Sequence, residues 1–199
     1  GLNTTPEQRT MIGKTLLQMA DDKTTTLSGF VGLIQDVAIR AAMETYTADG
    51  TMGHLLDADS DGLAFSDFTV FEIEDLMNLG DKYALPVLLY LFRRIEKSLR
   101  GQPAAIILDE AWLMLGHPVF REKIREWLKV LRKANCIVIM ATQSLSDASK
   151  SGILDVIVES TATKVFLPNA YARDEESAKL YAGMGLNKRQ IDILAEAVP

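Results

Sequence analysis

Apolar residues recur at intervals of three and four along the first part of the chain, which is the spacing of amphipathic helices. Thr5 and Gln8 form a capping-box pattern around Pro6, so a helix is predicted to begin at Pro6. A second helical stretch is predicted from Leu27 to Tyr46. We therefore expect residues 1–66 to form a helical insertion or appendage.

Short apolar strands alternate with helices beyond a polar turn at residues 57–67. The predicted strands are 68–73, 104–108, the CIVIMATQS segment from Cys136, and 163–167. The predicted helices are 86–99, 118–134, 153–159, 174–181 and 188–197. Such alternation is typical of a parallel sheet covered by helices on both faces. The sequence thus predicts an α/β core at residues 67–199.

Two acidic residues, Asp109 and Glu110, directly follow the uncharged strand at 104–108. The carboxyl ends of parallel strands form the ligand crevice of an α/β sheet. Phosphoryl transfer there needs a cation on the phosphates and a group that positions the attacking water. Asp109 suits the magnesium shell, and Glu110 suits the water. The alternative is that the pair caps the next helix, because a helix N-terminus favours acids.

A polar Thr142-Gln143-Ser144 cluster ends the next predicted strand. A glutamine at this point can hydrogen-bond both a γ-phosphate oxygen and the attacking water. The alternative is a simple strand-to-helix turn with Ser144 as the N-cap. Polar chemistry at two strand ends favours a nucleotide site.

Arg132 and Lys133 end the helix between these two strands. Cations in a last helical turn complement the helix dipole, and this is the simpler interpretation. The alternative is a contact with phosphate, in the same subunit or across an oligomer interface, as an arginine finger makes.

The composition argues against several other classes of protein. The chain has 27 acidic and 21 basic side chains and a net charge of −6, which does not suit a uniformly basic nucleic-acid surface. Cys136 is the only cysteine, so neither an internal disulfide nor a cysteine zinc cluster is expected. No apolar run reaches the roughly 18 residues that span a bilayer. We expect a fragment of a longer protein, because its opening is polar and its end carries no cap.

Three partial motifs do not carry the chemistry they suggest. MIGKT at 11–15 ends like a phosphate loop, but Gln8 occupies the required first glycine and the segment is predicted to be mid-helix. The run at 57–62 matches half of a calcium loop, but Phe68 stands where a bidentate glutamate is required. His54 and His117 have no second metal ligand at helical spacing.

Three blocks of sequence together resemble a known family. They are LLYLFRRIEKSLRGQPAAIILDEAW, REWLKVLRKANCIVIMATQSLSDASKSGILDVIVES and TKVFLPN. With these blocks the chain resembles the TrbE/CagE-type ATPases of conjugation and type IV secretion systems over nearly its whole length. The resemblance implies a RecA-like P-loop domain with a helical insertion, here lacking the Walker A strand and loop.

The resemblance also implies roles for individual residues. It implies Asp109 as the Walker B aspartate for Mg²⁺, Glu110 as the catalytic glutamate and Gln143 as the γ-phosphate sensor. Arg132 falls in the family's RK-x-N block, which favours a nucleotide or intersubunit role for it and its neighbour Lys133. ATP is the implied cofactor with Mg²⁺.

The implied whole is a motor subunit that works as an oligomer, usually a hexamer, at the cytoplasmic face of the bacterial inner membrane. Its partners would be other inner-membrane components and ATPases of the secretion system, and its cargo a DNA or protein substrate. Two alternatives stay open: a DNA-translocating ATPase of the FtsK/HerA type, and a non-catalytic assembly module.

Overall fold

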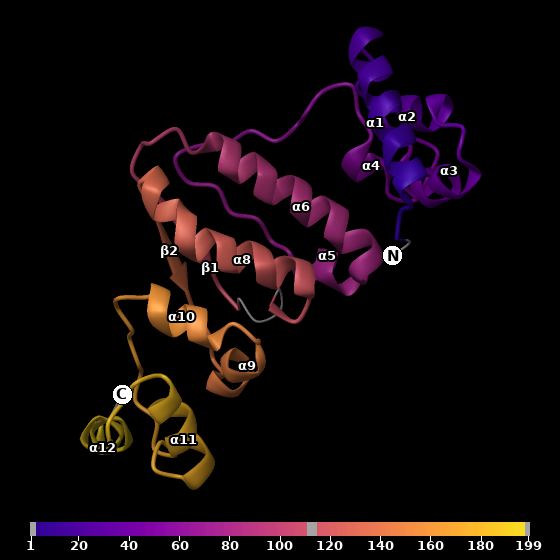
Figure 1. Ribbon diagram of the computed structural model, residues 1–199. Coiled ribbons are helices and arrows are strands. Elements are labelled where there is room, and N and C mark those ends of the chain that lie inside the picture. The colour runs from indigo at the N-terminus through magenta and orange to yellow at the C-terminus, as the bar shows by residue number, and fades with distance from the viewer. Residues whose placement is uncertain (1–2, 111–114, 198–199) are drawn as a thin grey trace. The chain divides into compact units, whose positions relative to one another are not determined.

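The computed structural model describes residues 3–110 and 115–197, which form two compact units, Gly1–Ser98 and Leu99–Pro199. The elements of both units are labelled in Figure 1. The α/β character predicted from the sequence is confirmed, although the described sheet has only two strands. None of the helices in the described ranges has both the length and the apolar character needed to cross a bilayer.

The N-terminal unit is helical. Its elements are α1 (Pro6–Asp21), α2 (Leu27–Leu33), α3 (Val37–Met43), the 3-10 turn η1 (Glu44–Tyr46), α4 (Gly53–Leu56), α5 (Glu74–Asn78) and α6 (Asp81–Ser98). The capping box predicted at the start of α1 is confirmed: Thr5 Oγ1 accepts from the Gln8 amide at 3.2 Å, and Gln8 Oε1 accepts from the Thr5 amide at 3.0 Å. A small core of Met19, Phe30, Ile34 and Ile39 holds the first three helices together.

The prediction of one helix from Leu27 to Tyr46 was wrong, because the chain leaves the helical conformation at Ile34 (ψ 130°). The Asp36 side chain accepts a hydrogen bond from the Ile39 amide at 2.9 Å and so starts α3 as a new helix. Short acidic side chains compete with helix continuation in this way. Ile34 is fully buried at the break, so the interruption places an apolar anchor in the core.

Asp57 joins segments of the N-terminal unit that are distant in sequence. Its carboxylate accepts hydrogen bonds from the backbone amides of Leu27 (2.6 Å), Ser28 (3.0 Å) and Ala48 (2.7 Å), and from the Ser28 hydroxyl. Burial raises the pKa of Asp57, but these hydrogen bonds outweigh it and hold the pKa below its usual value. The residue therefore fixes the start of α2 against the loop before α4.

Helix α6 begins at Asp81, five residues before the predicted start at Pro86. Proline has no amide hydrogen, so the Lys82 carbonyl lacks its usual partner four residues later. The buried Tyr46 hydroxyl donates to this carbonyl at 2.5 Å. A side chain from η1 thus satisfies the backbone group that Pro86 leaves open.

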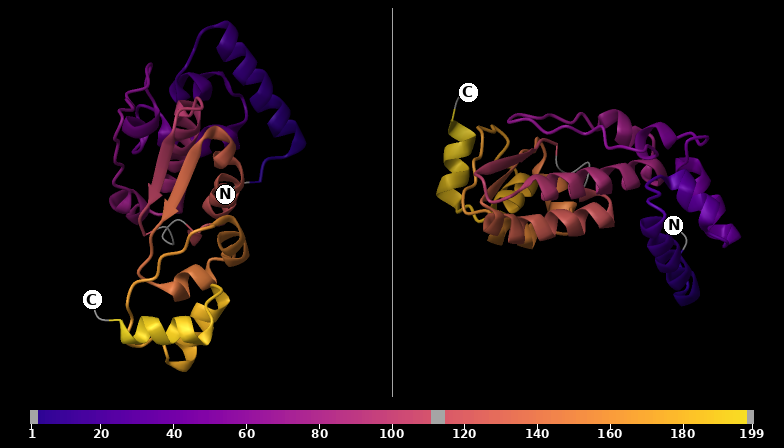
Figure 2. Two further views of the ribbon diagram at one scale, coloured as in Figure 1. Left: turned by 90° about the vertical axis from the view of Figure 1, so that its left-hand side faces the viewer. Right: turned by 90° about the horizontal axis from the view of Figure 1, so that it is seen from above.

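The C-terminal unit contains the sheet. Its elements are β1 (Ala104–Leu108), α8 (Pro118–Val130), the 3-10 turn η2 (Leu131–Ala134), β2 (Cys136–Met140), α9 (Leu145–Lys150), α10 (Leu154–Ser160), α11 (Glu175–Gly183) and α12 (Lys188–Glu196). The strands β1 and β2 are parallel and lie side by side (Figure 2), with Ala104 opposite Cys136 and Leu108 opposite Met140. Helix α8 connects them, and its apolar face buries Phe120, Ile124 and Trp127.

Asn135 sets the start of both strands. It adopts the left-handed conformation (φ 57°, ψ 34°), which asparagine tolerates at the end of a helix. Its carbonyl accepts from the Ala104 amide at 3.1 Å, and its side-chain amide donates to the Gly101 carbonyl at 3.2 Å. The turn out of η2 is thereby tied to the entry of β1.

The strands predicted at 68–73 and 163–167 were wrong, since neither segment pairs with a strand among the described residues. In the first, Ser66 and Thr69 bond to each other and to the local backbone. In the second, the Lys164 ammonium donates to two carbonyls at the end of α10, and Phe166 packs edge-on against Tyr181. Local contacts hold these segments extended but unpaired.

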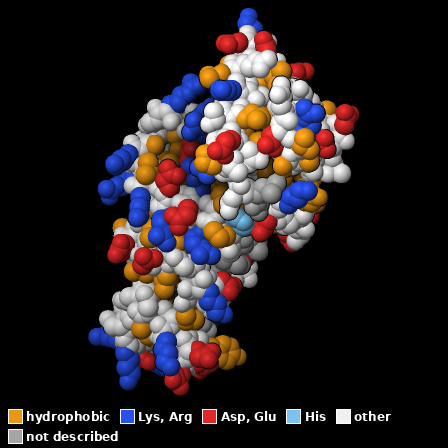
Figure 3. All heavy atoms as spheres, turned by 45° about the vertical axis from the view of Figure 1, so that its right-hand side comes forward, with side chains coloured by type: hydrophobic (Ala, Val, Ile, Leu, Met, Phe, Trp, Pro, Cys, Tyr) orange, Lys and Arg blue, Asp and Glu red, His pale blue; other side chains and the backbone are white. Residues whose placement is uncertain are grey.

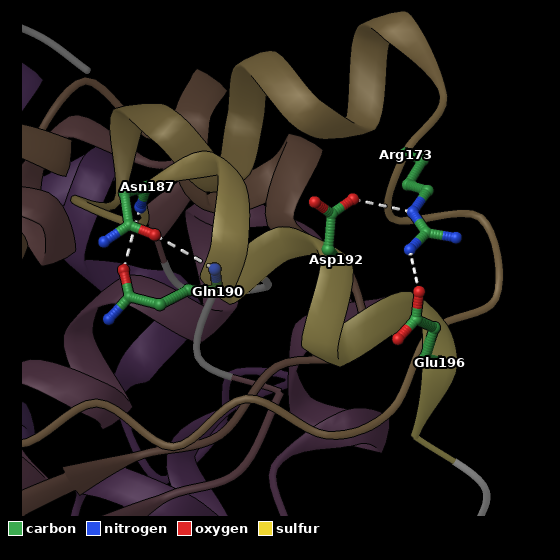
Figure 4. Close-up of polar contacts among 5 residues, drawn as sticks. All are labelled: Arg173, Asn187, Gln190, Asp192 and Glu196. Carbon is green, nitrogen blue, oxygen red and sulfur yellow. Dashed lines mark hydrogen bonds and ion pairs between the residues drawn. The ribbon is translucent and has the colours of Figure 1, made fainter.

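The last two helices pack around a small core of Ala172, Tyr181 and Ile191. A second capping box, formed by Asn187 and Gln190, starts α12 (Figure 4). The Arg173 guanidinium then reaches two carboxylates of α12, Asp192 at 2.7 Å and Glu196. These contacts position α12 beside the loop that precedes α11.

The Tyr46–Lys82 contact predicts a double-mutant effect on stability. Tyr46→Phe leaves a backbone carbonyl without its donor and should lower the free energy of unfolding of the N-terminal unit by about 1–2 kcal/mol. In a Pro86→Ala background the loss should be smaller by about 1 kcal/mol, because alanine restores the amide hydrogen that bonds the Lys82 carbonyl. Hydrogen exchange of the α6 amides measures both losses. Equal losses in the two backgrounds would contradict this account.

Asp57→Asn should destabilise the N-terminal unit by about 1–2 kcal/mol at neutral pH, because an amide accepts these hydrogen bonds less well than a carboxylate. The pKa of Asp57 is lower in the folded state, so its contribution is complete above the unfolded pKa of about 4 and is lost as the pH falls through the folded value. Urea unfolding of native chain and variant should therefore converge at acid pH. Asp59→Asn, in the same exposed turn, is the matched control. A difference that is independent of pH would refute the role of the charge.

Candidate functional site

The two strands end at the same edge of the sheet, here called the carboxyl edge. Leu108 lies opposite Met140, and the ladder extends by one further hydrogen bond, from the Ala141 amide to the Leu108 carbonyl at 3.0 Å. Asp109 and Glu110 leave β1 at this edge, while the Thr142–Ser144 turn leaves β2 there. The register therefore brings together the two polar segments that the sequence singles out.

Gln143 and Glu110 are in direct contact at the carboxyl edge. The Gln143 Nε2 donates to Glu110 Oε1 at 2.7 Å, across 33 residues of sequence. This is a charge-assisted hydrogen bond at the short end of the usual range. It shows that the two side chains point toward each other and serve one site.

Glu110 has a left-handed backbone conformation, with a φ of 52°. That conformation costs a residue with a Cβ atom roughly 1–2 kcal/mol. It turns the chain off β1 directly after Asp109, whose Oδ1 accepts from the Glu110 amide at 3.1 Å. Asp109 is exposed and Glu110 is half-buried, so both carboxylates are accessible from the carboxyl edge.

The turn after β2 is organised by two hydroxyls. Thr142 Oγ1 donates to the Ser144 carbonyl and accepts from the Ser144 amide, both at 3.0 Å. Ser144 in turn caps α9 by accepting from the Asp147 amide at 3.4 Å. The N-cap alternative for Ser144 is thus confirmed, and the turn leaves the Gln143 side chain directed at Glu110. Thr142 was noted in the sequence only as polar, since its bond back to Ser144 depends on the turn.

The structure does not bring Arg132 and Lys133 to the carboxyl edge. They lie in η2, which directly precedes β2 and so stands at the opposite edge of the sheet. Five residues of strand at about 3.3 Å each separate the two edges by roughly 16 Å. Both side chains are exposed and make no hydrogen bond or ion pair within the described part of the chain.

The partial motifs take structural positions. Gly13 and Thr15 lie inside α1, where Thr15 is buried. Asp57 is occupied by backbone amides, and Phe68 is 79% exposed. His117 caps α8, its Nδ1 accepting from the Val119 amide at 3.2 Å. In the ranges that the structure describes, no three metal-ligating side chains gather at one point.

Charge is distributed without a single dominant sign on the face drawn in Figure 3. Lysine and arginine side chains are interspersed there with aspartate and glutamate. The chain as a whole carries a net charge of −6. A broad basic surface for nucleic acid is therefore not what this face presents.

Parallel strands, a crossover helix and polar residues at the strand ends define an α/β domain of the P-loop class. Residues 35–195 match the family model of the TraG P-loop domain, and the chain belongs to this family. The match confirms the P-loop class and extends over both structural units.

Individual relatives agree with the family match. The chain is 57% identical over all 199 residues to the conjugal transfer protein TrbE of Rhizobium radiobacter, of which it covers 24%. It is 55% identical over the same length to a probable conjugal transfer protein TrbE of Sinorhizobium fredii, of which it covers 30%. It is also 38% identical over 111 residues, 55% of this chain, to 11% of the type IV secretion system protein CagE of Helicobacter pylori. The resemblance to TrbE/CagE-type proteins is thus confirmed, and the chain spans less than a third of the first two relatives.

Proposed function

We propose that this chain is the Walker B half of a RecA-like ATPase domain, within a motor subunit of a conjugative type IV secretion system. The observation that carries the proposal is the 2.7 Å contact between Gln143 and Glu110 at the carboxyl edge. It joins an acid suited to water activation and an amide suited to phosphate within one site. The names of the relatives supply the biological setting.

Asp109 has the chemistry of a magnesium-shell residue. Mg²⁺ prefers carboxylates and retained water, and Asp109 is an exposed carboxylate at the carboxyl edge. Its Oδ1 accepts one backbone amide, which orients the group. Mg²⁺, when bound with ATP, would neutralise charge on the phosphates.

Glu110 is proposed as the base that positions and deprotonates the attacking water, with the proton passing to its carboxylate. Gln143 is proposed as the side chain that senses the γ-phosphate, because its amide can donate to a phosphate oxygen. The left-handed turn at Glu110 supports these roles, since strained backbone conformations concentrate at functional sites.

The phosphate-binding loop is proposed to lie in a preceding part of the longer protein. The GKT of α1 cannot serve, because helical amides are committed to the helix. The sheet supports this view: Ile107, Ile137 and Ile139 are 62%, 61% and 46% exposed, whereas parallel sheets are usually covered on both faces. Further strands and helices would complete the RecA-like core, with residues 1–66 as its helical insertion.

The motor is proposed to act as a homo-oligomer, in the simplest case a hexamer, at the cytoplasmic face of the inner membrane. Other type IV secretion components would be its partners, and ATP hydrolysis would drive pilus assembly and the transfer of DNA or protein. Arg132 and Lys133 fit this arrangement only across a subunit interface, because they lie at the edge opposite Asp109.

Glu110→Gln in the full-length protein should reduce ATP turnover by about 100-fold, because the carboxylate base is lost while its size is kept. The variant should still bind ATP and should trap it. Steady-state phosphate release and retention of labelled ATP measure the two effects. Glu159→Gln, an exposed glutamate on α10, is the control and should turn over normally. Native turnover in Glu110→Gln would remove Glu110 from the mechanism.

Arg132 is expected to act in trans. Mixing Arg132→Ala subunits with Glu110→Gln subunits should restore ATPase activity, because some interfaces then pair an intact Arg132 with an intact Glu110. The control mixes Arg132→Ala subunits with the double variant Arg132→Ala/Glu110→Gln, which offers no intact interface and should stay inactive. If the first mixture shows no more activity than the second, Arg132 is not a trans-acting residue.

A further inference from the structure

The Gln143 amide has two partners that compete for it, and this inference rests on the proposed function. In the structure the amide donates to Glu110 Oε1 at 2.7 Å. The same donor is the group proposed to bind a γ-phosphate oxygen. A carboxylate and a phosphate are both anions, so placing them together on one amide is electrostatically unfavourable.

We infer that Gln143 is a positioning residue that restrains Glu110 until a nucleoside triphosphate takes its amide. While the amide donates to Glu110, one carboxylate oxygen is engaged and less able to accept a proton from water. When a γ-phosphate oxygen takes the donor, Glu110 is released to face the attacking water. Gln143 thus times the availability of the base, in addition to sensing the phosphate.

The geometry at the two strand ends favours an exchange of partners. The Thr142–Ser144 hydroxyl bonds and the N-cap of α9 hold the backbone on either side of Gln143, so its side chain can move without the turn. Glu110 is held by the ladder hydrogen bond behind it and by its contact with Asp109. Both side chains project from fixed backbone, and both lie where the hydrogen bond between them is exposed.

Competition has a thermodynamic signature that separates it from simple proximity. Removing the Glu110 carboxylate should tighten binding of a triphosphate, because the amide then has no other partner. Loss of a negative charge near the phosphates also tightens binding, but that effect does not need Gln143. A double-mutant cycle isolates the part that does.

The test is calorimetric binding of ATPγS and of ADP to the full-length protein, with native sequence, Glu110→Ala, Gln143→Ala and the double variant. Alanine at 110 carries the same left-handed backbone cost as other residues with a Cβ atom, so the turn is kept constant. Glu110→Ala should tighten ATPγS about tenfold more with Gln143 present than with Gln143→Ala, the size of one charge-assisted hydrogen bond. ADP affinity should show no such coupling. Glu110→Gln, which keeps a weaker acceptor, should lie between native and Glu110→Ala.

Two controls and three outcomes complete the test. Glu159→Ala should show no coupling with Gln143→Ala, and ADP binding reports that each variant is folded. Equal gains from Glu110→Ala in the two backgrounds would overturn the exchange of partners. So would weaker ATPγS binding by Glu110→Ala, which would mean that the amide bridges both groups. A native full-length protein that neither binds ATPγS nor hydrolyses ATP would overturn the proposed function itself, and the inference with it.

Discussion

The parallel pairing of β1 with β2 is the constraint on which the candidate site depends. At the start of the pair, Asn135 bonds to the entry of β1 through both its carbonyl and its side chain. At the end, the Ala141 amide extends the ladder past the last paired residues. A slip of one residue would turn every side chain to the other face of the sheet. Glu110 and Gln143 meet because the register is fixed at both ends.

The elements that the sequence predicted well are those with local signals. The capping box at Thr5 and Gln8, the proline at the start of α8, and the uninterrupted apolar run of β1 each specify a boundary within a few residues. The failures have a common physical cause. A period-two pattern at 68–73 or 163–167 records which side chains are suited to a covered face, but a strand also needs a partner that the pattern does not contain. The break at Ile34 likewise depends on how Asp36 competes with the helix and on a buried position in the core.

The site divides in the same way. Two polar clusters at the ends of predicted parallel strands were enough to place Asp109, Glu110 and Gln143 at one edge. The direct contact was beyond the sequence, because it requires the left-handed turn at Glu110. The positions of Arg132 and Lys133 were within reach of the sequence. A helix that connects two parallel strands ends where the second strand begins, so its last cations lie at the opposite edge from the strand ends.

The left-handed residues show what is unusual about Glu110. Among the described residues, three residues other than glycine have a positive φ: Lys23, Glu110 and Asn135. Lys23 and Asn135 each follow a helix, where a left-handed residue is a common way to end it. Glu110 follows a strand, so helix termination does not explain its conformation. The turn costs roughly 1–2 kcal/mol, and a charge-assisted hydrogen bond is of similar size. The contact with Gln143 therefore offsets the strain that directs the carboxylate across the edge, and a ligand that takes the amide must also bear that cost.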